Sequence, residues 1–468
     1  MTESPTTEAA PIARGLAEYI ASLKYEDLPE ATIAAAKEAI LDQFGIILMG
    51  STLPWTRPSY QLALDLGSKP QSTIAGHGDK VCSPDAAMVN SNYAHSCEFD
   101  DTGYSGGTHA SSITVASALA LAEARQLSGR DFLLAVVLGC QVLYKIGRVL
   151  TRPISELGFH AQALVGPFGS ATVTAKLLDL DVDTITHALS ITGSHSSGTM
   201  EYDQGGGEVK RYHSGMAARA GMIAALLAQN GLTGPPEIFE GKRGLGKLHA
   251  RLDDVSGILE EDSPEWFALE KRIVKAYPTV GTIPPAIQAF THLIRENNVT
   301  FDELERIDVW INPHALGHGA AIVKPKDTIG AQFSLAFSLG LAMIKGSNEL
   351  KYYVDPQVLA DPEVLAVGDK LYVHGDMKYG RATEIVDWDL YWGSRTQITL
   401  TDGRTFLREE LYRKGAPQNP LTHEELVGKF RSLASAAISD EQIDNLVAMV
   451  DNLENVENVA DIAALLHK

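Results

Sequence analysis

The 468-residue chain carries 39 basic and 59 acidic side chains, giving a formal net charge of −20, and 45% of its residues are hydrophobic. Such a length suffices for two domains or for one large domain with an insertion. Because no basic stripe offsets the negative charge, the composition argues against a nucleic-acid partner. The three cysteines, Cys82, Cys97 and Cys140, form no CxxC pair and no disulfide framework, which favours a reducing compartment.

Neither a targeting signal nor a membrane span is expected. The longest apolar run, residues 132–144, is interrupted by Gly139 and Gln141 and is too short to cross a bilayer. The first fifteen residues are polar and hold acids with a single arginine, unlike a signal or transit peptide. We therefore expect a cytoplasmic protein without a membrane partner.

Helical patterns dominate the first part of the chain. Apolar residues recur at spacings of three and four in residues 12–23, 29–49, 130–150 and 215–229. From residue 267 onward, strand patterns alternate with helical ones. Residues 306–313 alternate Ile307, Val309 and Ile311 with polar neighbours, as a half-buried strand does.

A second strand-like stretch runs from Glu384 to Leu411, with Asp402 and Gly403 marking a hairpin turn. From Thr422 onward the pattern returns to helix. The simplest architecture is mostly α with an α+β insertion. It has a large helical domain, residues 1–266 and 406–468, and a smaller α+β domain, residues 267–405.

Two histidines and several acids gather between two predicted helices. Ser83 and Pro84 are a favourable helix start, and a second helix is expected to begin near Ser111. His109 is therefore expected just before a helix N-terminus, where free N–H groups and the dipole favour an anion such as a carboxylate. In the alternative interpretation, the acids are helix caps and turn formers and the histidines are merely exposed.

This stretch resembles a motif of the MmgE/PrpD family. The family pattern is approximately H-x-x-D-F-D-D-T, followed within a few residues by T-H-P. Here residues 95–102 read HSCEFDDT and residues 108–110 read THA, with Glu98 where aspartate is usual. The resemblance extends from about residue 12 to residue 435. Members of the family include 2-methylcitrate dehydratase, cis-aconitate decarboxylase and iminodisuccinate epimerase. The resemblance implies a large helical domain combined with a smaller α+β domain that closes over the active site.

Three further segments resemble the family. Residues 158–160 read GFH, which implies that His160 lines the active site, although a histidine beside a small-residue helix is more often a core or capping residue. Lys210, Arg211 and His213 place three potential cations at a helix start, where the alternative is a solvated end of a surface loop. The resemblance implies that Lys210 lies in the active site. Lys275 matches the lysine of a K-x-Y-P segment.

Beyond Lys275 the chain departs from many relatives. Where these carry polar groups that include a histidine and a tyrosine, this chain has Val280, Gly281, Pro284 and Phe337. An apolar lining cannot compensate for the desolvation of a carboxylate. We therefore expect a substrate with fewer carboxylates than a tricarboxylic acid.

The resemblance also implies roles for the site residues. The family's reactions pass through a carbanion next to a carboxylate, and a histidine can move the proton without metal or cofactor. We expect His109 to be the principal acid or base and Asp101 to orient either His109 or the loop. His160 is expected to be the second proton donor or a carboxylate ligand, and Lys210 a carboxylate-binding cation. The expected substrate-binding residues are Glu98, Thr102, Lys275, Arg211 and His213.

The expected function is a cofactor-independent, dehydratase-like lyase, a hydro-lyase that acts on a small carboxylic acid. An epimerase, isomerase or decarboxylase of the same family is the nearest alternative, and a non-catalytic metabolite-binding homologue is the second. No clustered ligand set or nucleotide-binding loop is evident in the sequence, so we expect no metal and no organic cofactor. A homodimer is the expected assembly.

Overall fold

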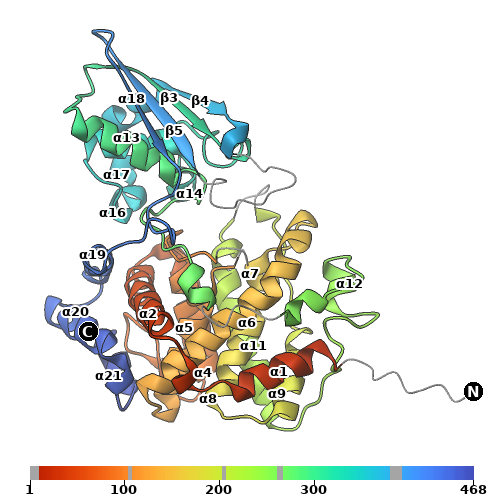
Figure 1. The fold of residues 1–468 in the computed structure, drawn as a ribbon. Helices are drawn as coiled ribbons and strands as arrows, with labels where there is room; N and C mark the ends of the chain where they lie inside the picture. Colours follow the sequence, from red (N-terminus) through yellow and green to blue (C-terminus); the bar gives the residue numbers. More distant parts are fainter. Residues whose placement is uncertain (1–9, 104–107, 203–206, 261–266, 380–392) are drawn as a thin grey trace, which may run out of the picture. The chain divides into compact units, whose positions relative to one another are not determined.

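The computed structural model describes residues 10–103, 108–202, 207–260, 267–379 and 393–468. The described chain is mostly helical with one small mixed sheet, which confirms the expected fold class. It divides into two compact units, each with its own core (Figure 1). Unit 1 comprises Met1–Arg272 and Thr422–Lys468, and unit 2 comprises Ile273–Leu421.

Unit 1 is built from helices. Before the insertion these are α1 (Ile12–Ser22), α2 (Glu30–Ser51), α3 (Arg57–Asp65), α4 (Ser83–His95), α5 (Ala110–Arg125), α6 (Gly129–Glu156), α7 (Ala161–Leu164), α8 (Gly166–Leu177), α9 (Val182–Thr192), α11 (Val209–Gln229) and α12 (Leu245–His249). After it come α19 (His423–Ala434), α20 (Asp440–Asp451) and α21 (Ala460–Leu465). Short elements complete the unit: η1 (Tyr25–Asp27), η2 (Pro54–Thr56), η3 (Ser256–Leu259), η4 (Ala268–Lys271), η8 (Leu453–Asn455) and the paired strands β1 (Ser72–Thr73) and β2 (Lys80–Val81).

Helix α6 forms part of the centre of unit 1. Its length and a mean hydropathy of 1.7 over its most apolar window would suit a membrane span, but 83% of that window is buried inside the protein. Residues such as Val142, Ile146 and Leu150 pack there with α1 and α8. We interpret α6 as a core helix, whose apolar side chains are needed for packing.

The helices that carry the candidate site pack unusually closely. A Cβ atom at Gly215 of α11 would lie 2.4 Å from the carbonyl oxygen of Met88 in α4, so only glycine fits there. The close approach lets Ser214 reach two other helices. Its Oγ lies 2.8 Å from that of Ser91 in α4 and 2.9 Å from that of Ser112 in α5.

Unit 2 contains a four-stranded sheet in the order β4 (Leu371–Gly375), β3 (Leu304–Ile311), β5 (Ser394–Leu400) and β6 (Thr405–Glu410). β4 is parallel to β3, and the other pairs are antiparallel. Inward side chains of β3 and β5 form a core with α13 (Pro284–Glu296) and α15 (Leu335–Ile344). The remaining elements are η5 (Pro313–Leu316), α14 (Thr328–Gln332), α16 (Leu350–Val354), α17 (Pro356–Leu359), α18 (Pro362–Gly368) and η6 (Met377–Tyr379).

The compact units differ from the expected domain limits of 267–405. Unit 2 runs from Ile273 to Leu421, because β6 pairs with β5 along its whole length and therefore belongs to the same sheet. Asp402 and Gly403 lie in the turn of this hairpin, as expected. The first part of the expected strand pattern, residues 384–392, lies outside the described residues.

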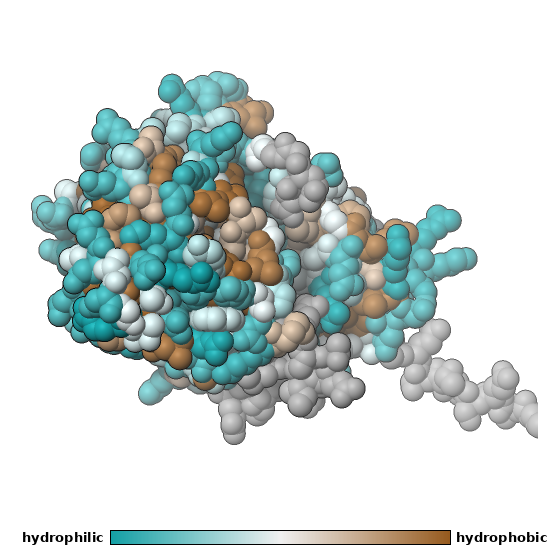
Figure 2. Space-filling view, turned by 90° about the horizontal axis from the view of Figure 1, so that it is seen from above, coloured by the Kyte–Doolittle hydropathy of each residue, from teal (hydrophilic) through white to brown (hydrophobic). Residues whose placement is uncertain are grey.

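On the face that Figure 2 shows, hydrophilic side chains predominate and smaller hydrophobic groups lie between them.

Candidate active site

The candidate site is organised by the segment between α4 and α5. We call residues 96–102 the acidic loop. Within it Glu98 has φ +52°, a left-handed conformation that costs a residue other than glycine about 1–3 kcal/mol. Surrounding contacts must hold this backbone in place. One of them is the indole N–H of Trp55, which donates to the carbonyl oxygen of Ser96 at 3.2 Å.

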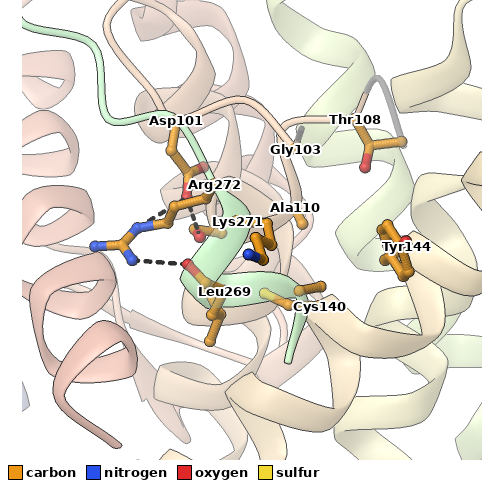
Figure 3. A pocket seen from close by; sticks show the side chains of 11 residues that line it. Asp101, Gly103, Thr108, Ala110, Cys140, Tyr144, Leu269, Lys271 and Arg272 are labelled. Atoms are coloured by element: carbon orange, nitrogen blue, oxygen red, sulfur yellow. Dashed lines mark hydrogen bonds and ion pairs between the residues drawn. The ribbon is translucent and has the colours of Figure 1, made fainter. Parts of the chain in front are cut away.

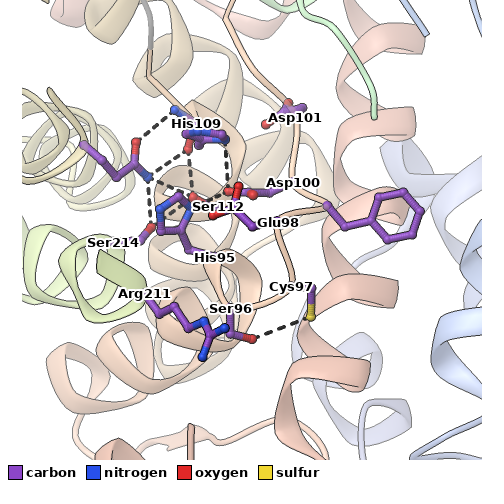
Figure 4. A network of polar contacts seen from close by, with 12 residues as sticks. His95, Ser96, Cys97, Glu98, Asp100, Asp101, His109, Ser112, Arg211 and Ser214 are labelled. Carbon is purple, nitrogen blue, oxygen red and sulfur yellow. Dashed lines mark hydrogen bonds and ion pairs between the residues drawn. The ribbon is translucent and has the colours of Figure 1, made fainter. Parts of the chain in front are cut away.

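The loop places one carboxylate beside two histidines. Oδ2 of Asp100 lies 2.7 Å from Nδ1 of His95, at the end of α4, and 3.3 Å from Nδ1 of His109, just before α5 (Figure 4). The side chains of His95 and Asp100 are each only 1% exposed, and that of His109 is 16% exposed. A carboxylate at this distance orients an imidazole and stabilises its protonated form.

A glutamine fixes the backbone of His109. The amide of His109 donates to Oε1 of Gln162, which lies on α7, at 2.9 Å. Nε2 of Gln162 in turn donates to the carbonyl oxygen of His109 at 3.2 Å, and to the hydroxyls of Ser112 and Ser214 at 3.0 Å each. Three helices are thereby linked at the position where His109 enters α5.

His160 is held by a short backbone pairing. Phe159 forms an antiparallel bridge with Thr199, and the amide of His160 donates to the carbonyl oxygen of Gly198 at 3.0 Å. Gly198 has φ +132°, and a Cβ there would lie 2.4 Å from that of Ala163, so glycine is required. His160 is thereby held immediately before α7.

His160 contacts a second histidine, from α11. Nδ1 of His160 lies 2.8 Å from Nδ1 of His213, so one of these two nitrogens carries the shared proton. Burial holds the pKa of His160 well below its usual range, and the neighbouring His95 and His213 add to this. Burial likewise lowers the pKa of His213 to about 4, assisted by His95 and Lys210. Both imidazoles are therefore neutral at pH 7.

Four histidines thus form one group, which we call the histidine cluster: His95, His109, His160 and His213. Ring centroids lie 4.8 Å apart for His95 and His109, 6.1 Å for His95 and His160, and 5.0 Å for His160 and His213. Tyr202 packs edge-on against the last two, at 5.5 and 5.8 Å.

Lys210 lies one helical turn before His213 and forms an ion pair with Glu98 of the acidic loop. The two charged groups are largely buried, with side chains 17% and 9% exposed. Arg211 points elsewhere. Its guanidinium pairs with Glu208 and lies 4.2 Å from the ring centroid of Trp55.

The next acid of the loop, Asp101, faces a different group of side chains. Figure 4 shows it apart from the contact between Asp100 and His109. Its Oδ2 accepts from the hydroxyl of Ser111 at 2.5 Å and lies 3.8 Å from Nε of Arg272. Burial raises the pKa of Asp101 to about 6. It lines a small pocket with Tyr144 and residues of η4 (Figure 3). Asp101 thus fixes the start of α5, whereas Asp100 is the carboxylate beside His109.

The remaining expected residues lie around the loop or in unit 2. Thr102 is half-buried beside Gly103, whose amide donates to the carbonyl oxygen of Thr108 at 2.9 Å. Lys275 is buried and follows Val274 at the start of unit 2. Its expected role in substrate binding stays a prediction.

The apolar replacements noted in the sequence are buried in unit 2. Val280 belongs to the unit's hydrophobic core. Phe337 is fully buried and packs edge-on against Tyr353, with ring centroids 5.7 Å apart. Both side chains therefore have a packing role.

Among the described residues, one group has the composition of a metal site. The nitrogen and oxygen atoms of His95, Asp100 and His109 all lie within 4.8 Å of one another. Asp100 is, however, close enough to share a proton with either imidazole. The contact of His95 with Asp100 is a hydrogen bond at 2.7 Å, so these two atoms are satisfied without an ion. The contact of His109 with Asp100, at 3.3 Å, is an ion-pair contact.

Several site residues were not predicted from the sequence. His95 and Asp100 stand inside the recognised motif, but nothing in the motif indicates which acid faces which histidine. Gln162 and Ser214 belong to no motif and lie far from residues 95–109 in sequence. Only the packing of α5, α7 and α11 reveals them.

Comparison with known proteins agrees with this architecture. The model of the MmgE/PrpD N-terminal domain matches residues 14–257, and that of the MmgE/PrpD C-terminal domain matches residues 277–455. The chain belongs to the MmgE/PrpD family.

Several curated relatives align over nearly the whole chain. The cis-aconitate decarboxylase-like protein oryM of Aspergillus oryzae is 26% identical over 100% of this chain and 99% of its own length. Cis-aconitate decarboxylase of Aspergillus terreus is 25% identical, covering 94% and 93% of the two chains. The mouse cis-aconitate decarboxylase is 27% identical, covering 95% and 91%.

Proposed function

We propose that the protein is a lyase that acts on a small carboxylic acid through a carbanion next to a carboxylate, and that decarboxylation is its reaction. The single observation that carries the proposal is the Asp100 carboxylate beside His109, in a cluster in which burial lowers the pKa of His160 and His213. The named activity of the relatives supports the choice of decarboxylation over dehydration.

In this reaction the bond between the substrate carbon and one carboxylate breaks and CO2 leaves. The electron pair stays on carbon, delocalised toward the remaining carboxylate, until the carbon takes a proton. His109 supplies that proton, since Asp100 stabilises its protonated form. The ammonium group of Lys210 binds the remaining substrate carboxylate. It does so either by giving up its ion pair with Glu98 or while that ion pair persists.

His160 acts as a neutral hydrogen-bond donor to the substrate. When His213 donates its Nδ1 proton to Nδ1 of His160, the proton of His160 resides on Nε2, the atom directed away from the pair. A neutral donor stabilises a developing negative charge without itself losing a proton. Such a donor typically contributes about 3–4 kcal/mol to the transition state.

Dehydration is the second candidate. Water elimination needs one group to remove a proton and another to protonate the departing hydroxyl. The described site offers two separate imidazole pairs, His95–His109 through Asp100 and His160–His213, which suits such a division of roles.

The substrate is expected to carry fewer carboxylates than cis-aconitate. Val280 and Phe337 stand where many relatives have polar groups, and both side chains are apolar and buried. An unpaired carboxylate placed against such side chains would cost several kcal/mol. At least one carboxylate remains, so Lys210→Ala should weaken the binding of every acid substrate strongly.

The test is a comparison of kcat/KM for cis-aconitate and 2-methylcitrate with that for mono- and dicarboxylic enoates and hydroxy acids, with CO2 measured directly. CO2 release supports the decarboxylase, and formation of an alkene without CO2 favours the hydro-lyase. Binding of an acid without turnover would indicate a non-catalytic homologue. Efficient turnover of either tricarboxylate would contradict the expected substrate class.

A further inference from the structure

A buried lysine from the C-terminal part of unit 1 lies against the acidic loop. Lys429 is on α19, and its side chain is 8% exposed. Its Nζ lies 2.7 Å from Oδ1 of Asp42 in α2 and donates to the carbonyl oxygen of Phe99 at 3.1 Å. It also lies 3.9 Å from the centroid of the Phe99 ring. One ammonium group therefore joins two helices to the backbone of the loop.

The Phe99 carbonyl that Lys429 contacts lies between the two acids of the loop that face Lys210 and His109. Phe99 stands between Glu98, which pairs with Lys210, and Asp100, which faces His109. Its carbonyl belongs to the peptide unit that leads into Asp100, so fixing this oxygen fixes the direction in which Asp100 leaves the backbone. The preceding residue, Glu98, has the strained left-handed conformation that surrounding contacts must maintain.

A role in stability alone is the competing explanation. The pair of Lys429 and Asp42 links α19 to α2, and both partners are buried. Burial raises the pKa of Asp42, and Lys429 opposes this shift. Buried ion pairs, however, are often no more stabilising than apolar side chains of similar volume. The hydrogen bond from this pair to the loop backbone is what a purely structural pair would not need.

We propose that Lys429 is a positioning residue of the site: held by Asp42, it fixes the Phe99 carbonyl and so keeps Glu98 and Asp100 directed at Lys210 and His109. The catalytic consequence rests on the proposed function. The dependence of the loop's shape on Lys429 does not rest on the proposed function.

The rate at which the Cys97 thiol is modified reports on the shape of the acidic loop and can be measured without an activity assay. It lies in the acidic loop, is 1% exposed, and burial raises the pKa of its thiol to about 12, so it should react slowly with thiol reagents. Cys140, in α6, is also buried and outside the loop, and serves as an internal reference for general unfolding.

The experiment measures N-ethylmaleimide modification of each cysteine in the full-length protein by peptide mass spectrometry. In Lys429→Met we expect Cys97 to react about tenfold faster or more, with Cys140 unchanged. The matched control is Lys37→Met. Lys37 lies on α2, as Asp42 does, and its Nζ is 2.5 Å from Glu454 of the C-terminal segment, but it does not touch the loop. The proposal is overturned if Cys97 reacts no faster in Lys429→Met than in Lys37→Met.

A second variant covers the case in which Lys429→Met does not fold. Asp42→Asn combined with Lys429→Met leaves no unpaired buried carboxylate, yet still lacks the donor to Phe99. Cys97 should stay reactive in this double variant. Recovery of the wild-type rate would overturn the proposal, because charge balance alone would then explain the lysine.

Steady-state kinetics provide a separate test of the catalytic part of the proposal. With any acid that the wild type turns over, Lys429→Met should lower kcat by about tenfold or more while KM changes little, and Lys37→Met should change neither. An unchanged kcat would overturn the catalytic part of the proposal. Absence of turnover in the wild type would contradict the proposed function and leave the labelling result standing.

Discussion

Two neighbouring aspartates in the acidic loop have different partners. Asp100 faces His95 and His109, whereas Asp101 accepts a hydrogen bond from Ser111 and lies near Arg272. We therefore expect Asp100→Asn to lower kcat by about 100-fold, because the amide neither stabilises a protonated His109 nor fixes its tautomer. Steady-state kinetics on the best substrate measure this effect.

The matched control is Asp101→Asn. This variant removes a carboxylate of the same loop that does not touch a histidine, so it should lower kcat much less. Equal losses in the two variants would show that the loop as a whole, rather than the carboxylate beside His109, governs the reaction.

The pair of His160 and His213 predicts a pH dependence of stability. Between the ordinary histidine pKa of 6.5 and about 4, the unfolded chain binds a proton at His213 and the folded chain does not. The free energy of unfolding therefore falls as the pH falls, by about 1.4 kcal/mol per pH unit for this residue. His160 acts in the same direction.

Denaturant unfolding between pH 7 and pH 4 measures this slope. Asp101, whose pKa is raised to about 6, opposes it below that pH, since the folded state then binds the additional proton. The decisive comparison is therefore with His213→Gln, which should show a shallower pH dependence than the wild type. Identical slopes would mean that His213 is not held neutral in the folded protein.

The sequence predicts the site's residue types better than their contacts. His109, His160 and Lys210 come from motifs, and the structure places them in one unit with the acidic loop. Asp101 is expected from the sequence to orient His109 or the loop; it contacts Ser111 at the start of α5, whereas the carboxylate beside His109 is that of Asp100. The direction of each aspartate depends on the left-handed backbone at Glu98, and a glutamate gives no sequence signal for that conformation.

At the scale of elements, Gln162 of α7 links α5 and α11 around His109. Gln162→Met has a similar volume but leaves the amide and carbonyl of His109 and two serine hydroxyls without this partner. We expect it to lower the free energy of unfolding by about 1–3 kcal/mol. It should also lower kcat, since His109 loses its backbone support.

Gln141→Met provides the control for this prediction. Gln141 is a buried glutamine of α6 that accepts a hydrogen bond from the amide of Ala268 at 2.7 Å, away from His109. Its loss should destabilise the protein to a similar degree and change kcat little. A similar loss of kcat in both variants would contradict a specific role for Gln162.

Helix boundaries near the site were predictable and the domain boundary was not. Ser83 and Pro84 begin α4 as expected, with the proline in the first turn, and α5 begins at Ala110, one residue before the expected start. The end of unit 2 depends instead on pairing of β6 with β5, which is a tertiary contact. Periodicity identifies the strands but not their membership of one sheet.

For the whole molecule, we expect activity without a metal ion. His95, Asp100 and His109 are close enough to bind one, but the hydrogen bond between His95 and Asp100 already satisfies two of their facing atoms. Extensive chelation should leave turnover unchanged, and metal analysis of the purified protein should find no stoichiometric ion. Loss of activity on chelation, with recovery on adding one divalent ion, would contradict this prediction.

Unit 2 should fold when produced alone as residues 273–421. It has its own core, and its two ends are joined where the amide of Val274 donates to the carbonyl oxygen of Gly415 at 2.9 Å. A cooperative thermal transition and dispersed amide resonances would confirm an independent domain. A spectrum typical of an unfolded chain would show that unit 1 is needed for its folding.

The interruption of unit 1 by unit 2 has a consequence for synthesis. The ribosome releases Ile273–Leu421 before α19, α20 and α21, so the inserted unit is complete while the helical unit still lacks its last helices. Lys429 arrives with α19, after every histidine of the cluster has been made. A nascent chain, or one truncated before Thr422, therefore contains all four imidazoles but lacks the group that holds Phe99. The ability to transfer protons should consequently appear only near the end of translation.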